Sequence, residues 1–248
     1  MDTALKISLS DRIQRVKPSP TLAVSALAGQ LRAEGRDIIG LATGEPDFDT
    51  PDSIKQAAID AINKGYTKYT AVDGTASLKQ AIINKFKREN DFDFSADQIL
   101  VSVGGKQAFY NLCQTLLNEG DEVIIPAPYW VSYPDIVKLA DATPVIVEGD
   151  ISQSFKITPE QLQQAITDKT KLFVINSPSN PSGKAYTRAE LKALADVLLQ
   201  HPDIVVMTDD IYEHIIWTDE GFVNILNTCP ELYDRTVVIN GVSKAYSM

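Results

Sequence analysis

The second half of the sequence alternates short β-branched runs with amphipathic stretches of helical length, and this alternation constrains the fold most strongly. Neighbouring parallel strands need a crossover between them, which is usually a helix. The alternation therefore predicts an α/β fold, a mainly parallel sheet with helices on both faces. The strand-type runs are residues 98–103, 122–130, 144–149, 171–177, 204–210 and 236–240.

Helices are predicted both within this alternation and before it. Thr158 with Gln161, and Thr187 with Glu190, have the spacing of capping boxes, in which side chains satisfy the free amides of a first helical turn. The segments before residue 98 are predicted to be a polar arm at 1–20, a short strand and turn at 37–48, and helices at 21–35, 50–62 and 75–90.

Composition excludes several classes of partner. The 248 residues are 44% apolar and 23% charged, as in soluble globular proteins. With 23 basic and 33 acidic residues the net charge is −10, which argues against a nucleic-acid or anionic membrane partner. No apolar run approaches the length of a membrane helix, and the N-terminus is not of signal-peptide type. Cys113 and Cys229 have no metal or redox spacing, so a cytoplasmic protein is predicted.

The carboxyl ends of parallel strands meet at one edge of a sheet, where ligands gather. Gly104, Gly105 and Lys106 follow the first strand-type run and begin a helix, where backbone amides favour a phosphate. A tight strand-to-helix turn explains these glycines equally well, and no Walker A or GxGxxG pattern is present. Tyr129 and Trp130 end the second run, and Trp130 suits either stacking on a heteroaromatic ring or a buried core.

The later strand ends carry further polar groups. Asn180 offers an amide donor within the irregular loop 176–183, and Asp209 offers an acid that keeps a buried ring nitrogen protonated. Tyr212 offers a donor to a phenolate oxygen. Lys244 follows the last run, and a lysine there is either a solvated surface residue or an amine that forms an imine with a carbonyl compound such as pyridoxal phosphate. Five such strand ends together indicate a cofactor site.

The motifs SVGGKQA, PAPYWVSYP, NSPSNPSG, DDIYEH and NGVSKAYSM resemble the signatures of class I pyridoxal-phosphate aminotransferases. With LATGEPDFDTP and TKYTAVDG they are most similar to the bacterial aspartate aminotransferases of that class. The resemblance extends from about residue 37 to residue 248, and it implies the large domain of fold type I. The departures are Ser182, where the family more often has Thr, and Asp210, where it often has Glu.

The resemblance implies a role for each strand-end residue. Lys244 is the Schiff-base lysine and proton shuttle, Asp209 pairs with the pyridine nitrogen, and Trp130 stacks on the ring. Tyr212 and Asn180 contact the oxygen of the ring hydroxyl.

Further roles follow from the same resemblance. Gly104, Gly105 and Lys106 form the phosphate turn. Gly44 offers its amide near the substrate carboxylate, with Trp130 and Asn180 beside it. Tyr69 matches the tyrosine that reaches the phosphate of the neighbouring subunit, which implies a homodimer.

The resemblance also divides the chain. Residues 1–45 correspond to an N-terminal arm and the N-terminal part of the small domain, and residues 46–248 to the large cofactor-binding domain. In the family the lysine motif continues into a Gly-Trp-Arg segment and the rest of the small domain. The chain is therefore expected to be a fragment, incomplete at the C-terminal end of the large domain and inactive alone.

The function implied is transfer of an amino group from L-aspartate to 2-oxoglutarate. Aromatic, glutamine/kynurenine and prephenate specificities remain alternatives, as does an inactive fragment. A fragment that only binds a partner, and a nucleotide-binding α/β protein that uses Gly104 to Lys106, are the alternatives from other classes. His201 and His214 stand singly and no metal motif is present, so no metal site is expected.

Overall fold

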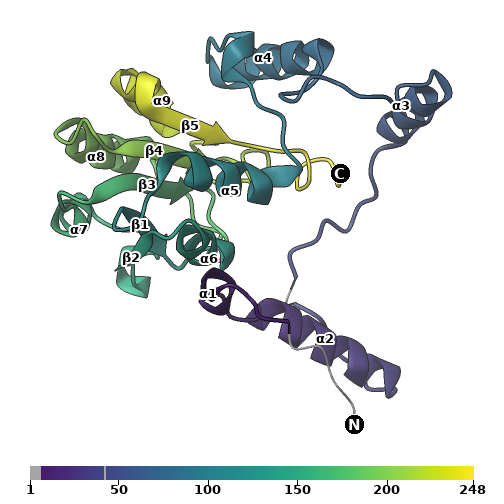
Figure 1. Ribbon diagram of the computed structural model, residues 1–248, viewed down its shortest axis with the longest axis horizontal. Helices are drawn as coiled ribbons and strands as arrows, with labels where there is room; N and C mark the ends of the chain where they lie inside the picture. The colour runs from purple at the N-terminus through teal and green to yellow at the C-terminus, as the bar shows by residue number, and fades with distance from the viewer. Residues whose placement is uncertain (1–6, 42) are drawn as a thin grey trace.

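The centre of the molecule is a parallel sheet covered by helices (Figure 1). A computed structural model describes residues 7–41 and 43–248 of the chain. All four strand pairings are parallel, and the strand order is β2-β1-β3-β4-β5. The α/β prediction is therefore confirmed. The strands are β1 Glu122–Ala127, β2 Thr143–Glu148, β3 Thr170–Asn176, β4 Val205–Asp209 and β5 Thr236–Ile239.

The helices begin where the capping signals predict. Thr158 and Thr187 each form a capping box, at the start of α7 and of α8. No helix in the two described ranges is long and apolar enough to cross a membrane. The helices are α1 Asp11–Gln14, α2 Pro20–Ala33, α3 Asp52–Asn63, α4 Ala76–Asn90, α5 Gly104–Leu116, α6 Ser132–Leu139, α7 Pro159–Ala165, α8 Arg188–Leu199 and α9 Ile225–Thr228, with short 3-10 turns η1 Ala96–Gln98, η2 Ile151–Gln153 and η3 Pro230–Arg235.

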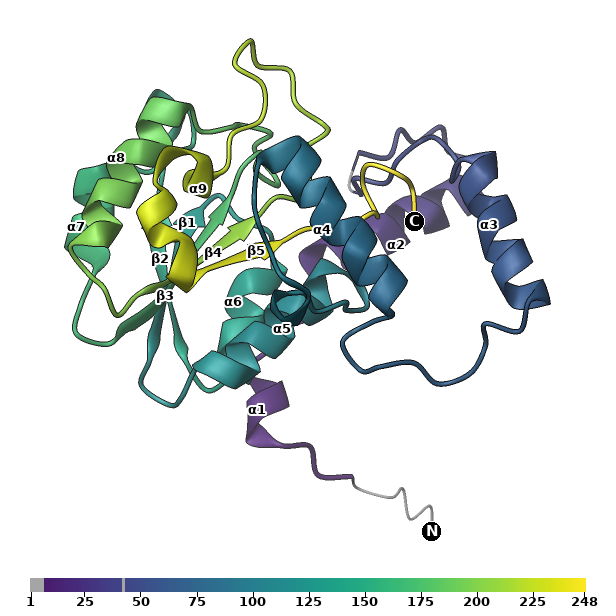
Figure 2. The same ribbon diagram turned by 90° about the horizontal axis from the view of Figure 1, so that it is seen from above.

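Alternating side chains along each strand build one core on each face of the sheet. In β1, Val123 and Ile125 pack into the cluster formed with α5 and α6, whereas Ile124 packs into the cluster formed with α7 and α8. All three are fully buried. Figure 2 shows α7 and α8 on one side of the sheet and α5 and α6 on the other. Helices on both faces explain why these strands are apolar throughout.

Two predicted strands are wrong. Residues 37–41 and 99–103 belong to no strand of the described part of the chain, and Gln98, the first residue of the predicted strand 98–103, ends the 3-10 turn η1. A β-branched run becomes a strand only when a neighbour accepts its backbone hydrogen bonds, and sequence alone does not say whether one is there. Val101 instead donates its amide to the Asp73 carbonyl at 3.1 Å, and Val103 is 86% exposed.

Helices α2 and α3 lie outside this layered body. Helices α2 and α3 stand apart from the sheet in both views (Figures 1 and 2), and α3 contains no buried residue. Helix α1 is tied to the end of α6, because Arg12 and Arg15 bind the Asp141 carboxylate at 2.9 and 2.8 Å. The domain boundary at residue 45 stays a prediction.

The layered core predicts that the same substitution costs more stability in an interior strand than in an edge strand. Ile124 in the interior strand β1 is fully buried, whereas Ile146 in the edge strand β2 is 38% exposed. We expect Ile124→Ala to lower the free energy of unfolding by about 2–5 kcal/mol, because it leaves a cavity, and Ile146→Ala by about 1 kcal/mol or less. Urea unfolding followed by circular dichroism measures both; equal losses would contradict the observed layering.

Candidate active site

The strand order reverses direction at the carboxyl edge of the sheet, between β1 and β3. From β1 the chain passes to β2 on one side and then returns to place β3 on the other side of β1. The connections therefore diverge above β1 and β3, which is where open α/β sheets bind ligands. Tyr129 and Trp130 follow β1, Asn180 follows β3, and Asp209 ends β4.

Asp209 is a buried carboxylate at this edge, with 8% of its surface exposed. One carboxylate oxygen accepts a hydrogen bond from the Tyr133 hydroxyl of α6, and the other accepts from the Ile211 amide at 3.2 Å. Burial raises the pKa of Asp209, and these two donors partly oppose the rise because they stabilise the charged form. The pKa of Tyr133 is raised well above its usual range by burial and by the Asp209 charge.

Asp210 points the other way, as the alternation of a strand predicts. Its side chain accepts from the Thr208 hydroxyl at 2.6 Å and from Asn224 Nδ2 at 2.5 Å, and 1% of the residue is exposed. Burial raises the pKa of Asp210 to about 7, against the two hydrogen bonds. Asp210 therefore supports the start of α9, and Asp209 is the acid that faces α6 and Tyr133.

Asn180 and Tyr212 lie together beside Asp209. Asn180 Nδ2 is 3.5 Å from the Tyr212 hydroxyl, and burial followed by the charge of Asp209 raises the Tyr212 pKa. Asn176 holds the arrangement, because its side chain accepts from the Asn180 amide at 2.8 Å and donates to the Asp209 carbonyl at 2.9 Å. The ends of β3 and β4 are thereby fixed to each other.

Trp130 and the start of α5 form the opposite part of the edge. The Trp130 ring meets Tyr133 edge to face at 5.3 Å, and Lys106 Nζ lies 5.2 Å from the Trp130 ring centroid. Gly104 has φ +77°, a conformation that favours glycine. The Gly104 amide donates to the Ser102 carbonyl at 2.9 Å, and no side chain caps α5. The amides that follow Gly104 and the positive end of the helix dipole therefore favour an anion.

Lys244 lies in the segment that follows β5. Its Nζ donates to the Gly44 carbonyl at 2.8 Å, and both residues line one pocket. Residue Tyr69 is fully exposed and is not part of that pocket. In the described part of the chain, no hydrogen bond joins Lys244 to Asp209. The pocket is lined by Thr43, Gly44, Glu45, Pro46, Phe48, Asp49, Thr50, Ser243, Lys244, Ser247 and Met248.

The structure thus forms two groups from the predicted residues. Trp130, Asn180, Asp209 and Tyr212 gather with the α5 turn at the sheet edge, while Lys244 and Gly44 meet across the pocket after β5. The backbone links the two groups, because the Asp210 amide donates to the Ile239 carbonyl at 2.8 Å. Their roles toward a cofactor stay predictions at this point.

Sequence reasoning misses three side chains of this edge. Tyr133 has a signal, since it comes one helical turn after Trp130 and so lies on the same side of the chain. Asn176 is the last residue of β3, where a polar side chain ends an apolar run. Asn224 stands far from any motif, and only the fold brings it to Asp210.

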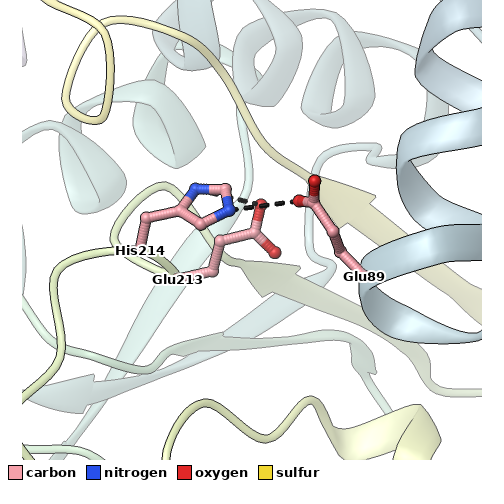
Figure 3. A group of neighbouring side chains, drawn as sticks. All are labelled: Glu89, Glu213 and His214. Atoms are coloured by element: carbon pink, nitrogen blue, oxygen red, sulfur yellow. Dashed lines mark hydrogen bonds and ion pairs between the residues drawn. The ribbon is translucent and has the colours of Figure 1, made fainter.

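A separate group of Glu89, Glu213 and His214 lies beside helix α4 (Figure 3). His214 Nε2 is 3.1 Å from a Glu89 oxygen. The Lys85 ammonium binds Glu213 and is 3.6 Å from Glu89, so a lysine already occupies the position of a cation. This group is therefore an ion-pair network rather than a candidate metal centre.

Comparison with known proteins shows the family. A model of the family "Aminotransferase class I and II" matches residues 36–248. An aspartate/prephenate aminotransferase of Nitrosomonas europaea is 63% identical over 242 residues, which are 98% of this chain and 61% of that protein. One of Cereibacter sphaeroides is 59% identical over 240 residues, 97% and 60% of the respective chains. The chain belongs to the class I and II aminotransferase family and spans about 60% of the length of these relatives.

Solved structures of aspartate aminotransferases have the same fold as this chain. The aspartate aminotransferase from Rhizobium meliloti superposes with a TM-score of 0.94 at 47% identity, over 98% of this chain and 61% of that one. The Thermus thermophilus aspartate aminotransferase with maleate gives a TM-score of 0.91 at 44% identity, over 98% and 62%. The prediction of the fold type I aminotransferase architecture is thereby confirmed.

The raised pKa of Asp210 predicts a pH-dependent stability. The folded state binds this proton more tightly than the unfolded chain, so the free energy of unfolding falls as the pH rises from about 4 through about 7. Asp210→Asn removes the titrating group. We expect the wild type to lose more stability than Asp210→Asn between pH 5 and pH 8, by on the order of 2 kcal/mol. Urea unfolding at the two pH values measures this, and Asp209 contributes equally to both proteins.

Proposed function

We propose that the full-length protein is a pyridoxal-phosphate-dependent aminotransferase that moves an amino group from L-aspartate to 2-oxoglutarate. The observation that carries the proposal is the convergence of Asp209, Asn180, Tyr212 and Trp130 at one edge of a sheet with the fold of the aspartate aminotransferases. The chain spans about 60% of its relatives, so the proposal concerns the full-length protein.

The donors and acceptors at this edge fit pyridoxal phosphate. A buried carboxylate suits a protonated pyridine nitrogen, and the uncapped start of α5 with Gly104 and Gly105 suits the phosphate. A Cβ on Gly104 would meet no atom within 4 Å, so the space above this turn is open. When bound, the cofactor supplies an aldehyde and an electron-accepting ring.

Three side chains would orient the ring. Asp209 would hold a proton on the ring nitrogen, because an opposite charge in a buried site favours the protonated form. Asn180 and Tyr212 would donate hydrogen bonds to the ring oxygen, as their mutual distance of 3.5 Å allows a shared acceptor between them. Trp130 would stack on the ring, with Lys106 beside it at the phosphate turn.

Lys244 and Gly44 would serve the substrate side. Lys244 would hold the cofactor through its amine and, once released, move the proton of the substrate α-carbon. Gly44, whose carbonyl accepts from Lys244 at 2.8 Å, would offer its amide to the substrate carboxylate. Trp130 and Asn180 would complete the substrate contacts.

A dicarboxylic substrate is favoured by the relatives. The Thermus thermophilus enzyme was solved with maleate, a four-carbon dicarboxylate like aspartate, and the curated relatives are named for aspartate and prephenate. Prephenate as the amino acceptor is therefore the second candidate. The partners proposed are amino-acid and 2-oxo-acid substrates, and the compartment proposed is the cytoplasm.

A homodimer is proposed for the full-length protein. Tyr69 is fully exposed in the chain described, so its hydroxyl is free to reach a second subunit. Tyr66 and Val72, three residues before and after it in the sequence, are exposed apolar residues of the kind that a subunit interface covers.

Turnover and the bound-cofactor spectrum test the proposal. The 248 residues are produced alone and also extended by the part of the Nitrosomonas europaea relative that they do not cover. We expect the extended chain to show a visible band with pyridoxal phosphate that borohydride abolishes, and to convert aspartate with 2-oxoglutarate. Lys244→Ala loses both, and the 248-residue chain alone is inactive. Faster transfer to prephenate would favour the second candidate, and a reducible band in Lys244→Ala would exclude Lys244 as the cofactor lysine.

The assignment of the ring acid has its own test. Asp209→Asn removes the charge beside Tyr133, whereas Asp210→Asn removes one that contacts Thr208 and Asn224. In the extended chain we expect Asp209→Asn to lower kcat about 100-fold or more and Asp210→Asn about 10-fold or less. Steady-state kinetics with aspartate measure both, and the reverse order would show that Asp210 is the acid.

A further inference from the structure

Glu213 is a buried carboxylate at the meeting point of three chain segments. It lies in the turn after β4, with 6% of its surface exposed. Helix α4 approaches it from one side and the segment after β5 from another. Figure 3 shows Glu213 beside His214, with Glu89 reaching toward them from α4.

Three donors from two other segments converge on the Glu213 carboxylate. Asn240 Nδ2, just after β5, donates to one oxygen at 2.8 Å, and Lys85 Nζ of α4 donates to the same oxygen. Asn90 Nδ2, at the end of α4, donates to the other oxygen at 3.1 Å. A buried carboxylate satisfied from two directions fixes the segments that supply its donors.

The donors to Glu213 are themselves held by further hydrogen bonds. Lys85 also donates to the Asn90 side chain at 2.9 Å, so both α4 residues are oriented toward Glu213. The Asn240 side chain accepts from the Gly241 amide at 2.7 Å, which fixes its amide group to donate to Glu213. A Cβ on Gly241 would come within 2.9 Å of Ile211, so the two segments are in close contact there.

The segments joined in this way carry two proposed active-site residues. Tyr212 immediately precedes Glu213, and Lys244 comes four residues after Asn240. Glu213 points away from the sheet edge into the network with α4, so it touches none of the groups proposed to contact the cofactor. Its effect on the reaction is therefore indirect.

We infer that Glu213 is a positioning residue that holds the Tyr212 turn and the Lys244 segment at a fixed separation by accepting hydrogen bonds from Asn240 and from helix α4. The inference rests on the proposed function for what the two segments do. It goes beyond that function in naming the group that sets their mutual position.

The experiment uses the full-length protein with pyridoxal phosphate and two variants that loosen the link. Glu213→Gln keeps the shape but places an amide donor against Asn90 or Asn240, and Asn240→Ala removes the contact while leaving the Lys85 pair intact. Glu190→Gln is the matched control, because Glu190 also binds a lysine, Lys156 at 2.6 Å, but lies at the start of α8.

A spectroscopic reading separates positioning from stability. Tyr212 is proposed to donate a hydrogen bond to the oxygen on the cofactor ring. This bond weakens the attraction between that oxygen and the proton on the Lys244 nitrogen. We expect Glu213→Gln and Asn240→Ala to raise the pH midpoint of the visible band, in the same direction as Tyr212→Phe. Both lower kcat about 10-fold with KM for aspartate changed less than about 2-fold. Glu190→Gln lowers stability only.

A rescue and a cofactor-free measurement complete the test. Glu213→Gln with Asn240→Asp exchanges amide and carboxylate across the same contact, and we expect it to return the midpoint toward the wild-type value. Hydrogen exchange without cofactor should quicken in residues 210–215 and 239–244 in both single variants, and not in Glu190→Gln.

Each outcome decides one claim. An unchanged midpoint and unchanged exchange in Asn240→Ala, or in a folded Glu213→Gln, overturns the inference. If the wild-type protein shows no borohydride-sensitive band, the proposed function fails, and hydrogen exchange alone then decides whether Glu213 joins the two segments.

Discussion

The burial of the Asp209 carboxylate is the constraint on which this part of the structure depends. A charge taken out of water is costly unless hydrogen bonds compensate it, and Asp209 receives them from the Tyr133 hydroxyl and the Ile211 amide. Tyr133 needs α6 to lie across the sheet edge, and Ile211 needs the chain to turn sharply after β4. The surroundings of one carboxylate therefore account for the positions of a helix and a turn.

Local physical chemistry explains what could be predicted from the sequence. The helices at Thr158 and Thr187 begin at their capping boxes because those hydrogen bonds form between residues three apart. Strand alternation predicts that Asp209 and Asp210 face opposite ways, and the structure has the two side chains on opposite faces, toward Tyr133 and toward Asn224.

The features that the sequence did not predict depend on contacts with residues in other segments of the chain. Residues 99–103 have the composition of a strand, but a ladder needs a neighbour, and no described strand pairs with them. Asn224 reaches Asp210 because the connection after β4 folds back on itself, and Asn240 reaches Glu213 because β5 pairs with β4. Such contacts have no periodicity or spacing within one segment, so only the folded chain reveals them.

The attachment of α1 gives α6 a second connection. Arg12 and Arg15 form ion pairs with Asp141, just after the end of α6. Helix α6 also carries Tyr133, which contacts both Trp130 and Asp209. A continuous series of contacts therefore connects α1, through α6, to the Trp130 indole at the sheet edge. Because an indole reports the polarity around it, the emission of Trp130, once the exposed Trp217 is replaced by phenylalanine, is an intrinsic optical gauge of whether α1 is seated on α6, with no label introduced.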